Sequence, residues 1–328
     1  MPRWTPDLPR FALLDGPSPL QPLERFSDAL GGRTEIWIKR EDLLPLAFGG
    51  NKLRNLEFLV GAAIAEDADT LVTAGRRWSN HCRLTAAAGA RAGLAVHLVL
   101  SGPPAAVAGP NERLDEILGA VIHVAPTDAR ADRDALVAQV TADLRQAGRR
   151  PYVIDVGGSG VVGAVGSTLA GLEVADQAAA AGRLFASVVA PTATGGTQAG
   201  LLVGLALAGR SATAVRGIAV AHPAAHLAPT VIGMVDGLVA LTGLHPGAVG
   251  PIEIDDAQLG AGYGHPTPEA EAAMRLLART EGILVDPIYT AKALAGLVAG
   301  VNLGVFDGQA VVFWHAGGTP GLFETLVD

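Results

Sequence analysis

Lysine is nearly absent from this sequence. Of its 24 lysine and arginine residues, only Lys39, Lys52 and Lys292 are lysines. An arginine keeps its proton in a protein, whereas a desolvated lysine can become a neutral amine and form a Schiff base with a carbonyl compound. Each lysine in such a chain is therefore a candidate for chemistry that arginine cannot perform.

Cysteine and charge are scarce as well. The single cysteine, Cys82, excludes an intramolecular disulfide and a cysteine-based zinc cluster, and we expect no metal site. Charged residues make up 17% of the chain, the net charge is -8 and no basic run stands out, so no nucleic-acid partner is expected. Residues 1–6 hold no apolar stretch, which predicts a cytoplasmic protein without a signal peptide.

One long uncharged segment could be mistaken for a membrane span. Residues 185–209 carry no charged side chain and are long enough to cross a bilayer. The segment also contains Pro191, Gly195 and Gly196, which favour a buried strand, a glycine turn and a buried helix. We therefore predict no membrane partner.

Short β-branched runs alternate along the chain with Ala- and Leu-rich segments of helical length. With 49% hydrophobic residues and 42 glycines, the chain can bury a large core and form many tight turns. The alternation predicts an α/β fold with open, twisted, mostly parallel sheets covered by helices. Strands are expected at 36–38, 70–73, 96–100, 121–124, 152–154, 187–189, 217–220 and 311–314, and helices at 80–92, 131–147 and 268–280.

Glycine-rich turns at 49–50 and 157–160 are the best candidates for crossings between two domains. They divide the chain into a large domain, residues 1–50 and 160–328, and a small α/β domain, residues 51–159. Ligands of open α/β sheets bind at the carboxyl ends of the strands, so we expect the site between the domains.

Two glycine-rich segments are candidates for cofactor binding. Lys52 follows Gly-Gly-Asn in a loop, and we infer that it carries pyridoxal 5'-phosphate (PLP); the alternative is an ordinary solvated or phosphate-binding lysine. Residues 192–200 follow an expected strand and open a helix, with Thr194, Gly195, Gly196 and Thr197 at the turn. Backbone N–H groups, hydroxyls and a helix N-terminus make this turn a phosphate site, unless it is only a packing turn.

Polar and aromatic residues stand on three further loops. Trp78, Ser79, Asn80 and His81 open a helix after a strand and could receive an amino-acid carboxylate, although Ser79 or Asn80 could simply be its N-cap. Tyr263 and Tyr289 stand on loops that could reach a cleft, or could pack at the surface.

Six ordered motifs together resemble one enzyme family. The chain is similar to the fold-type-II PLP enzymes (tryptophan-synthase-β-like), in the branch of D-cysteine desulfhydrase and 1-aminocyclopropane-1-carboxylate (ACC) deaminase. The resemblance covers nearly the whole chain. Its motifs are Lys-Arg-Glu-Asp (39–42), Gly-Gly-Asn-Lys-x-Arg (49–54), Ser-Asn-His (79–81), Gly-Gly-Thr-Gln-Ala-Gly (195–200), Asp-Pro-x-Tyr-Thr (286–290) and His-x-Gly-Gly-x-Pro-Gly (315–321).

The resemblance implies a role for each site residue. Lys52 would hold PLP as a Schiff base and move the Cα proton, with Asn51 and residues 194–197 around the cofactor. Asn80 would contact the phenolic oxygen O3' of PLP, and Thr290 would lie near the pyridine nitrogen. The substrate would meet Ser79, Asn80, His81 and Trp78 and be flanked by Tyr263 and Tyr289. Lys39 and Lys292 would be structural, and the protein a homodimer.

The resemblance also implies a reaction on a small amino acid. β-Elimination from D-cysteine or a related β-substituted amino acid would give pyruvate, ammonia and sulfide. The alternatives are an ACC deaminase that gives 2-oxobutanoate and a catalytically weak ligand-binding protein. Thr290 replaces the glutamate that the deaminases generally have, which favours the lyase. Trp78 and Ala316 also depart from the family pattern, at positions where glutamine and threonine are usual.

Overall fold

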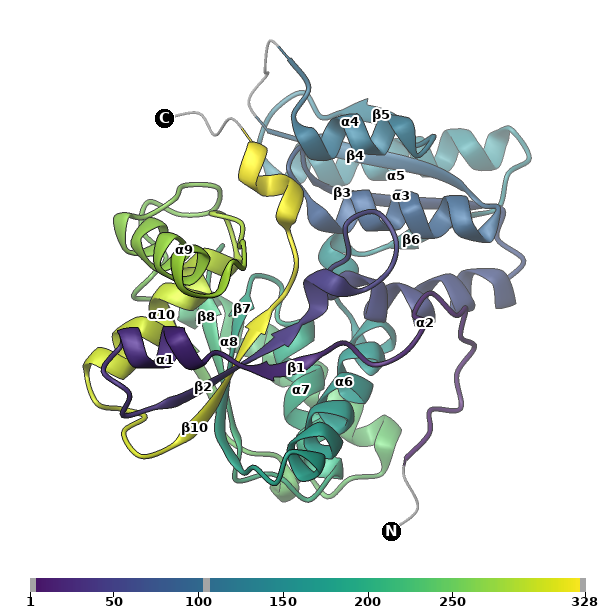
Figure 1. Cartoon of the computed structure of the whole chain (residues 1–328). Coiled ribbons are helices and arrows are strands. Elements are labelled where there is room, and N and C mark those ends of the chain that lie inside the picture. The colour runs from purple at the N-terminus through teal and green to yellow at the C-terminus, as the bar shows by residue number, and fades with distance from the viewer. Residues whose placement is uncertain (1–3, 103–106, 325–328) are drawn as a thin grey trace.

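The chain folds around two separate β-sheets, each covered by helices (Figure 1). The structure is a computed structural model and describes residues 4–102 and 107–324. Within these residues the larger sheet has six strands in the order β1-β2-β10-β7-β8-β9, and the smaller has four in the order β5-β4-β3-β6. All neighbouring strands are parallel apart from β1 and β2.

The strands are β1 (Leu20–Pro22), β2 (Glu35–Arg40), β3 (Thr70–Arg76), β4 (Ala95–Ser101), β5 (Val121–Val124), β6 (Pro151–Ile154), β7 (Phe185–Thr192), β8 (Ala214–Ala219), β9 (Ile252–Asp255) and β10 (Ala310–His315). The helices are α1 (Glu24–Ala29), α2 (Lys52–Ala65), α3 (Asn80–Ala92), α4 (Pro110–Ile117), α5 (Arg130–Gln146), α6 (Val161–Ala180), α7 (Gly196–Leu207), α8 (Ala224–Thr242), α9 (Pro268–Glu281) and α10 (Thr290–Asn302). Short 3-10 helices are η1 (Glu41–Leu43), η2 (Val156–Gly158), η3 (Pro246–Ala248) and η4 (Thr319–Phe323).

The larger sheet is buried on both faces because successive strand residues point to opposite sides. In β10, Val311 and Phe313 pack with α9 and α10, whereas Val312 and Trp314 pack with α6, α7 and α8. All four side chains are fully buried. The sequence of a strand that is covered on both sides is a continuous apolar run, because every side chain is buried. Residues 311–314 are apolar throughout for this reason.

The smaller sheet follows the same rule. Leu71 of β3 packs in a cluster with α2 and α3, and the next residue, Val72, packs with α5 on the other face. Helix α2 also packs against α6, which covers the larger sheet, so α2 lies between the two sheets (Figure 1). The predicted domain boundaries at residues 50 and 159 stay a prediction.

Each of the eight expected strands overlaps an observed one, although β8 begins and ends earlier than the expected 217–220, and α3 has the expected bounds. The predicted ends of α5 and α9 differ from the observed ones by one residue. The strands β1 and β9, which are the edge strands of the larger sheet, were not predicted from the sequence. Both are short and only partly buried, so their sequences lack the apolar run that marks a central strand.

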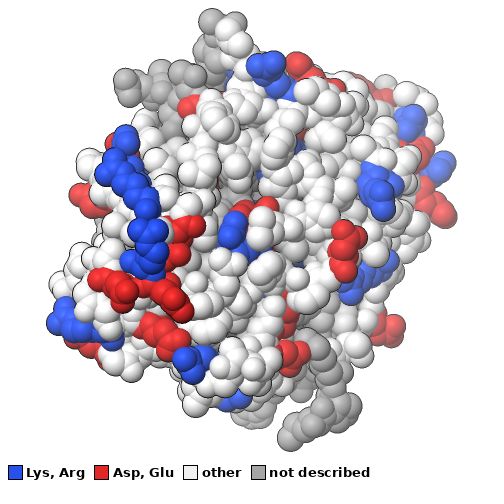
Figure 2. Space-filling model, in the orientation of Figure 1, with Lys and Arg blue, Asp and Glu red and all other residues white. Residues whose placement is uncertain are grey.

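The uncharged segment at 185–209 forms β7, the turn after it, and α7, as predicted. A different helix, α8, is long and apolar enough by length and composition to span a membrane. Its inner side, including Leu227, Val231 and Leu238, is buried in the core over α7. On the face shown in Figure 2, positive and negative side chains are interspersed.

The topology brings three motif loops together. The strands β3, β7 and β10 are all central in their sheets, and the residues that follow their carboxyl ends are 77–79, 193–195 and 316–318. Parallel strands end at the same edge, so the loops after β7 and β10 are neighbours. Lys52 stands at the start of α2, directly beside the loop after β10, because the Asn51 N–H donates to the Ala316 carbonyl at 3.0 Å.

Candidate active site

The three lysines differ in their surroundings. Lys39 is fully buried and forms an ion pair with Glu173. Lys292 donates hydrogen bonds to two carbonyls of the 259–262 loop, at 2.8 and 2.9 Å. In the described part of the chain, the Lys52 amine has no hydrogen-bond or ion-pair partner. Lys52 is therefore the lysine that is free to react.

Burial also makes the Lys52 amine easier to deprotonate. Desolvation lowers the pKa of Lys52 from 10.5 to about 8. A neutral amine is the form that attacks a carbonyl carbon or accepts a proton. Desolvation lowers the pKa of Lys292 to about 8 as well, but its two carbonyl partners occupy the ammonium. The free amine and its lowered pKa together make Lys52 the candidate for covalent chemistry.

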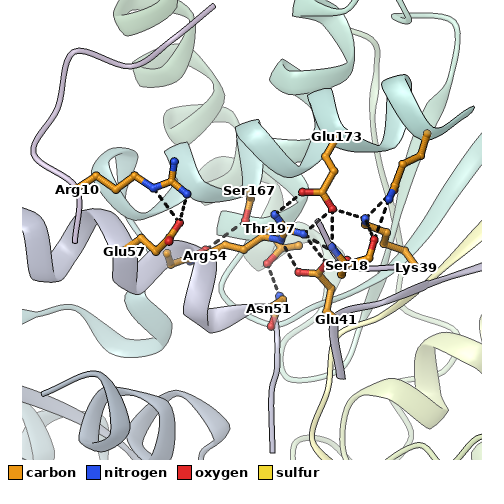
Figure 3. Close-up of polar contacts among 12 residues, drawn as sticks. Arg10, Ser18, Lys39, Glu41, Asn51, Arg54, Glu57, Ser167, Glu173 and Thr197 are labelled. Carbon is orange, nitrogen blue, oxygen red and sulfur yellow. Dashed lines mark hydrogen bonds and ion pairs between the residues drawn. The ribbon is translucent and has the colours of Figure 1, made fainter. Parts of the chain in front are cut away.

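A buried ionic network anchors the first turn of α2 (Figure 3). The Arg54 guanidinium, two residues after Lys52, pairs with Glu41 at 2.5 Å and with Glu173 at 2.9 Å. Glu173 also pairs with Lys39, so two positive and two negative groups balance one another. These pairs tie α2 to β2, η1 and α6, and thereby fix where Lys52 begins its helix.

The turn between β7 and α7 has the geometry of an anion site. Gly195 adopts φ = 82° and is the N-cap of α7. A Cβ at this position would lie 2.7 Å from Val231, so a larger residue would not fit in this backbone conformation. The first N–H groups of α7 and its positive dipole end favour a phosphate there.

Two threonine hydroxyls of this turn are held ready to donate. Asn51 Nδ2 donates to Thr197 Oγ1 at 2.8 Å, and Ser159 Oγ donates to Thr194 Oγ1 at 2.5 Å. Each threonine oxygen thus accepts one bond and keeps its own proton for an anion. Ser159 was missed in the sequence, where the turn 157–160 was interpreted only as a domain crossing.

Ser79 is the N-cap of α3, as one of the two interpretations of the sequence had it. Its Oγ accepts a hydrogen bond from the Cys82 N–H at 3.2 Å. This capping role leaves the hydroxyl proton available, because the oxygen is used as an acceptor. Ser79 can therefore cap the helix and still donate to a ligand carboxylate at the helix N-terminus.

The hydrogen bonds of Thr73 determine the tautomer of His81. Thr73 donates its single proton to the Ile154 carbonyl at 2.8 Å, so its oxygen accepts from His81 Nε2, 3.0 Å away. His81 Nδ1 then carries a free lone pair, and this buried atom has no partner within the described residues. Burial and the charge of Lys52 lower the pKa of His81 to about 3, so the ring is neutral at physiological pH.

Trp78, Tyr263 and Tyr289 form one aromatic wall. Ring centroids are 5.9 Å apart for Trp78 and Tyr263 and 5.6 Å apart for the two tyrosines, whose hydroxyls are in short contact. Burial raises the pKa of Tyr263 to about 12, and that of Tyr289 also rises, so both keep their protons. The Lys292 ammonium fixes the loop that carries Tyr263.

The Asp286 carboxylate shapes the turn that carries Tyr289 and Thr290. It accepts from the N–H groups of Ile288, Tyr289 and Thr290 at 3.0, 2.8 and 3.1 Å. The buried Thr290 hydroxyl donates to the Gly317 carbonyl at 3.0 Å, which joins this turn to the loop after β10. A hydroxyl at this position brings no negative charge.

The segments predicted to form the site lie together. The Asn51 side chain, next to Lys52, bonds to Thr197 in the phosphate turn, and the charge of Lys52 contributes to the lowered pKa of His81. The Thr290 hydroxyl connects the tyrosine turn to the loop at Gly317. A free amine, a helix N-terminus with two donor hydroxyls and an unused buried acceptor fit the aldehyde, phosphate and polar ring substituents of PLP. The roles of the individual residues remain predictions.

Known proteins match along nearly the whole chain. Residues 11–317 match the family of pyridoxal-phosphate dependent enzymes. Proteins named D-cysteine desulfhydrase from Salmonella choleraesuis (strain SC-B67) and Salmonella paratyphi C (strain RKS4594) are each 41% identical over 324 residues, which cover 96% of this chain and 95% of the relative.

Two solved structures resemble the fold of this chain. An ACC deaminase homologue superposes with a TM-score of 0.89 at 33% identity and covers 97% of this chain and 94% of its own. A threonine deaminase from T.th. has a TM-score of 0.67 at 19% identity over 92% of both chains, which shows the shared fold alone. The chain belongs to the fold-type-II pyridoxal-phosphate dependent enzymes, in the D-cysteine desulfhydrase and ACC deaminase family, and its cofactor is PLP.

Proposed function

We propose that the protein is a carbon–sulfur lyase that converts D-cysteine or a related β-substituted amino acid, with water, into pyruvate, ammonia and the leaving group, sulfide for cysteine. The observation that carries this proposal is the free Lys52 amine with its lowered pKa, in a chain 41% identical to proteins named D-cysteine desulfhydrase. The buried neutral acceptor of His81 and the aromatic wall of Trp78, Tyr263 and Tyr289 support a site for a small polar substrate.

In the proposed mechanism the side chains bind the cofactor and the substrate, orient them, and transfer one proton. Bound PLP supplies the electron sink that accepts charge from the substrate Cα. The Thr194 and Thr197 hydroxyls and the N-terminus of α7 hold its phosphate. The Ser79 hydroxyl, at the N-terminus of α3, binds the substrate carboxylate. Lys52 as a neutral amine takes the Cα proton, and a pKa of about 8 leaves a useful neutral fraction near pH 7.5.

The other side chains fix polarity and exclude water. The neutral His81 presents Nδ1 as an acceptor to the substrate or to Lys52, and Thr73 prevents the ring from turning. Tyr263 and Tyr289 keep their protons because burial raises both pKa values, so a tyrosine hydroxyl can donate a hydrogen bond to a departing thiolate. The Trp78 ring packs against the Tyr263 ring and would flank the substrate.

ACC deamination is the second candidate. The match to an ACC deaminase homologue and the short contact between the Tyr263 and Tyr289 hydroxyls favour it, because the cyclopropane substrate has no Cα hydrogen and needs an acid, base or nucleophile at a ring carbon. Thr290 argues against it. Its hydroxyl is engaged with Gly317 and supplies no charge to keep a pyridine nitrogen protonated, so the sink is weaker.

One incubation series separates these functions. The purified PLP-loaded protein is given D-cysteine, L-cysteine or ACC, and 2-oxo acid and sulfide are measured. Equal amounts of sulfide and pyruvate from D-cysteine support the lyase, and 2-oxobutanoate from ACC supports the deaminase. Lack of turnover with all three, with PLP bound, would refute both and point to another amino acid.

We also propose a cytoplasmic homodimer. The outer side of α8 exposes Ile232 and Leu241, at 48% and 41% of their surface, with Asp236 as its one acidic residue. An apolar helix side of this kind suits a second copy of the chain. Light scattering of the wild type and of Ile232→Asp tests this: a dimer that becomes a monomer supports α8 as the interface, and a wild-type monomer refutes the dimer.

A further inference from the structure

Arg83 contacts Asn80, one of the proposed cofactor residues, and has no role in the mechanism above. It lies on the first turn of α3, its side chain is fully buried, and its guanidinium makes three directed hydrogen bonds. Nη1 donates to Asn80 Oδ1 at 3.1 Å and to Asn111 Oδ1 at 2.9 Å, and Nη2 donates to the Gly49 carbonyl at 3.0 Å. Burying a charged guanidinium is costly, so its partners must compensate for the loss of water.

These bonds determine which way the Asn80 amide faces. Asn80 Oδ1 accepts from Arg83 and, at 3.5 Å, from Asn111 Nδ2, whose amide is held in turn by the Trp78 carbonyl at 2.9 Å. With the oxygen fixed on this side, Nδ2 must point away from Arg83. It lies beside Gly318, 3.0 Å from where a Cβ would stand. Asn80 is thus oriented as a hydrogen-bond donor toward the loop after β10.

The same guanidinium holds the loop that leads into Lys52. Leu46, Ala47 and Phe48 have φ values of 67°, 43° and 66°, and Gly49 and Gly50 follow with positive φ. Non-glycine residues in this region cost roughly 1–2 kcal/mol each, so the surrounding structure must hold them. The bond from Nη2 to the Gly49 carbonyl is one such restraint, three residues before Lys52.

We propose that Arg83 is a positioning residue that orients Asn80 as the donor to the phenolic oxygen of PLP. The proposal rests on the proposed role of Asn80 but not on the identity of the amino-acid substrate. The planar fork reaches Asn80 and Asn111 from Nη1 and Gly49 from Nη2, whereas a lysine has one nitrogen on a flexible stem and lacks this fixed geometry. Arg83 itself touches neither the cofactor nor the substrate.

The test uses the visible absorption of bound PLP rather than turnover. An N–H donor on the phenolic oxygen withdraws electron density and lowers the proton affinity of the chromophore, so its loss raises the pH midpoint of the visible band. Arg83→Met and Asn80→Ala should each raise this midpoint and weaken PLP binding about tenfold, which corresponds to about 1.4 kcal/mol. Arg91→Met, at an exposed arginine of the same helix, is the matched control and should change neither value.

A double variant distinguishes positioning from general damage. If Arg83 acts through Asn80, Arg83→Met in the Asn80→Ala background raises the midpoint no further. Additive shifts, or a lower melting temperature with an unchanged midpoint, overturn the proposal. If Arg83→Met does not fold, Arg83→Lys replaces it: a raised midpoint supports the fork, and an unchanged one overturns it. None of these readouts depends on D-cysteine turnover, so they can fail or succeed apart from the proposed lyase activity.

Discussion

Glu173 provides a quantitative test of the ionic network beneath α2. Its carboxylate accepts from the Arg54 guanidinium at 2.9 and 3.0 Å and from the Ser18 N–H at 3.0 Å, and it pairs with the fully buried Lys39. Glu173→Gln keeps the shape but removes one negative charge from a cluster of two positive and two negative groups. One buried positive charge is then left uncompensated.

The expected loss is at the lower end of the range for breaking a buried pair, because the Glu173 side chain is 16% exposed. We expect the free energy of unfolding to fall by about 3 kcal/mol. Chemical denaturation of the PLP-free protein, followed by tryptophan fluorescence, measures this value. The control is Glu271→Gln, which removes an exposed i,i+4 pair with Arg275 and should cost no more than about 0.5 kcal/mol.

A second substitution tests whether charge balance is the cause. Lys39→Met combined with Glu173→Gln removes one charge of each sign, so the double variant should be more stable than Glu173→Gln alone. A loss below about 1 kcal/mol for Glu173→Gln, or a double variant less stable than either single one, would refute the reasoning.

The pH dependence has a defined sign. Burial alone would raise the pKa of Glu173, but the charges of Arg54 and Lys39 outweigh this effect. The pKa of Glu173 in the folded protein therefore lies below its ordinary value of 4.5. A carboxylate with a lowered pKa in the folded state stabilises the protein above its unfolded pKa, and this contribution disappears as the pH falls through the folded pKa. The stability gap between wild type and Glu173→Gln should therefore shrink below about pH 4.5.

The remaining predictions concern the active site. Lys52→Ala should abolish the visible absorption of covalently bound PLP and reduce turnover about 10³-fold. If that absorption band is retained in the variant, Lys52 is not the residue that binds PLP covalently. Tyr289→Phe should slow turnover roughly 10²-fold with PLP still bound, and loss of PLP would make Tyr289 a cofactor residue instead. Trp78→Gln should change the ratio of kcat/KM between D-cysteine and a bulkier β-substituted amino acid about tenfold, and an unchanged ratio would place Trp78 outside the pocket.

The fold was largely predictable because its central strands are buried on both faces. Such strands give uninterrupted apolar runs, and 311–314 and 187–189 were found for this reason. The edge strands β1 and β9 carry no such signal, since water covers part of each. The site loops were predictable where glycine or lysine was chemically unusual, as at Lys52 and Gly195.

Residues that act through another side chain gave no signal in the sequence. Thr73 looked like an ordinary strand residue, yet its bond to the Ile154 carbonyl sets the tautomer of His81. Ser159 contacts Thr194 across 35 positions, and Glu173 reaches Arg54 across 119. Spacing cannot reveal such pairs, because they form only when distant elements pack. Short motifs thus indicate which groups are present, and the packing decides which of them are free.

That distinction explains how the chain selects one amine. All three lysines are removed from bulk water, which lowers the pKa of each. The amines of Lys39 and Lys292 are held by acceptors, Glu173 for Lys39 and two carbonyls for Lys292, and these contacts keep both amines away from a carbonyl carbon. Lys52 is desolvated as well but has no acceptor among the described residues, so its neutral amine is free to react. Lys52 is therefore the reactive lysine because, among the described residues, it lacks acceptors of the kind that hold the other two amines.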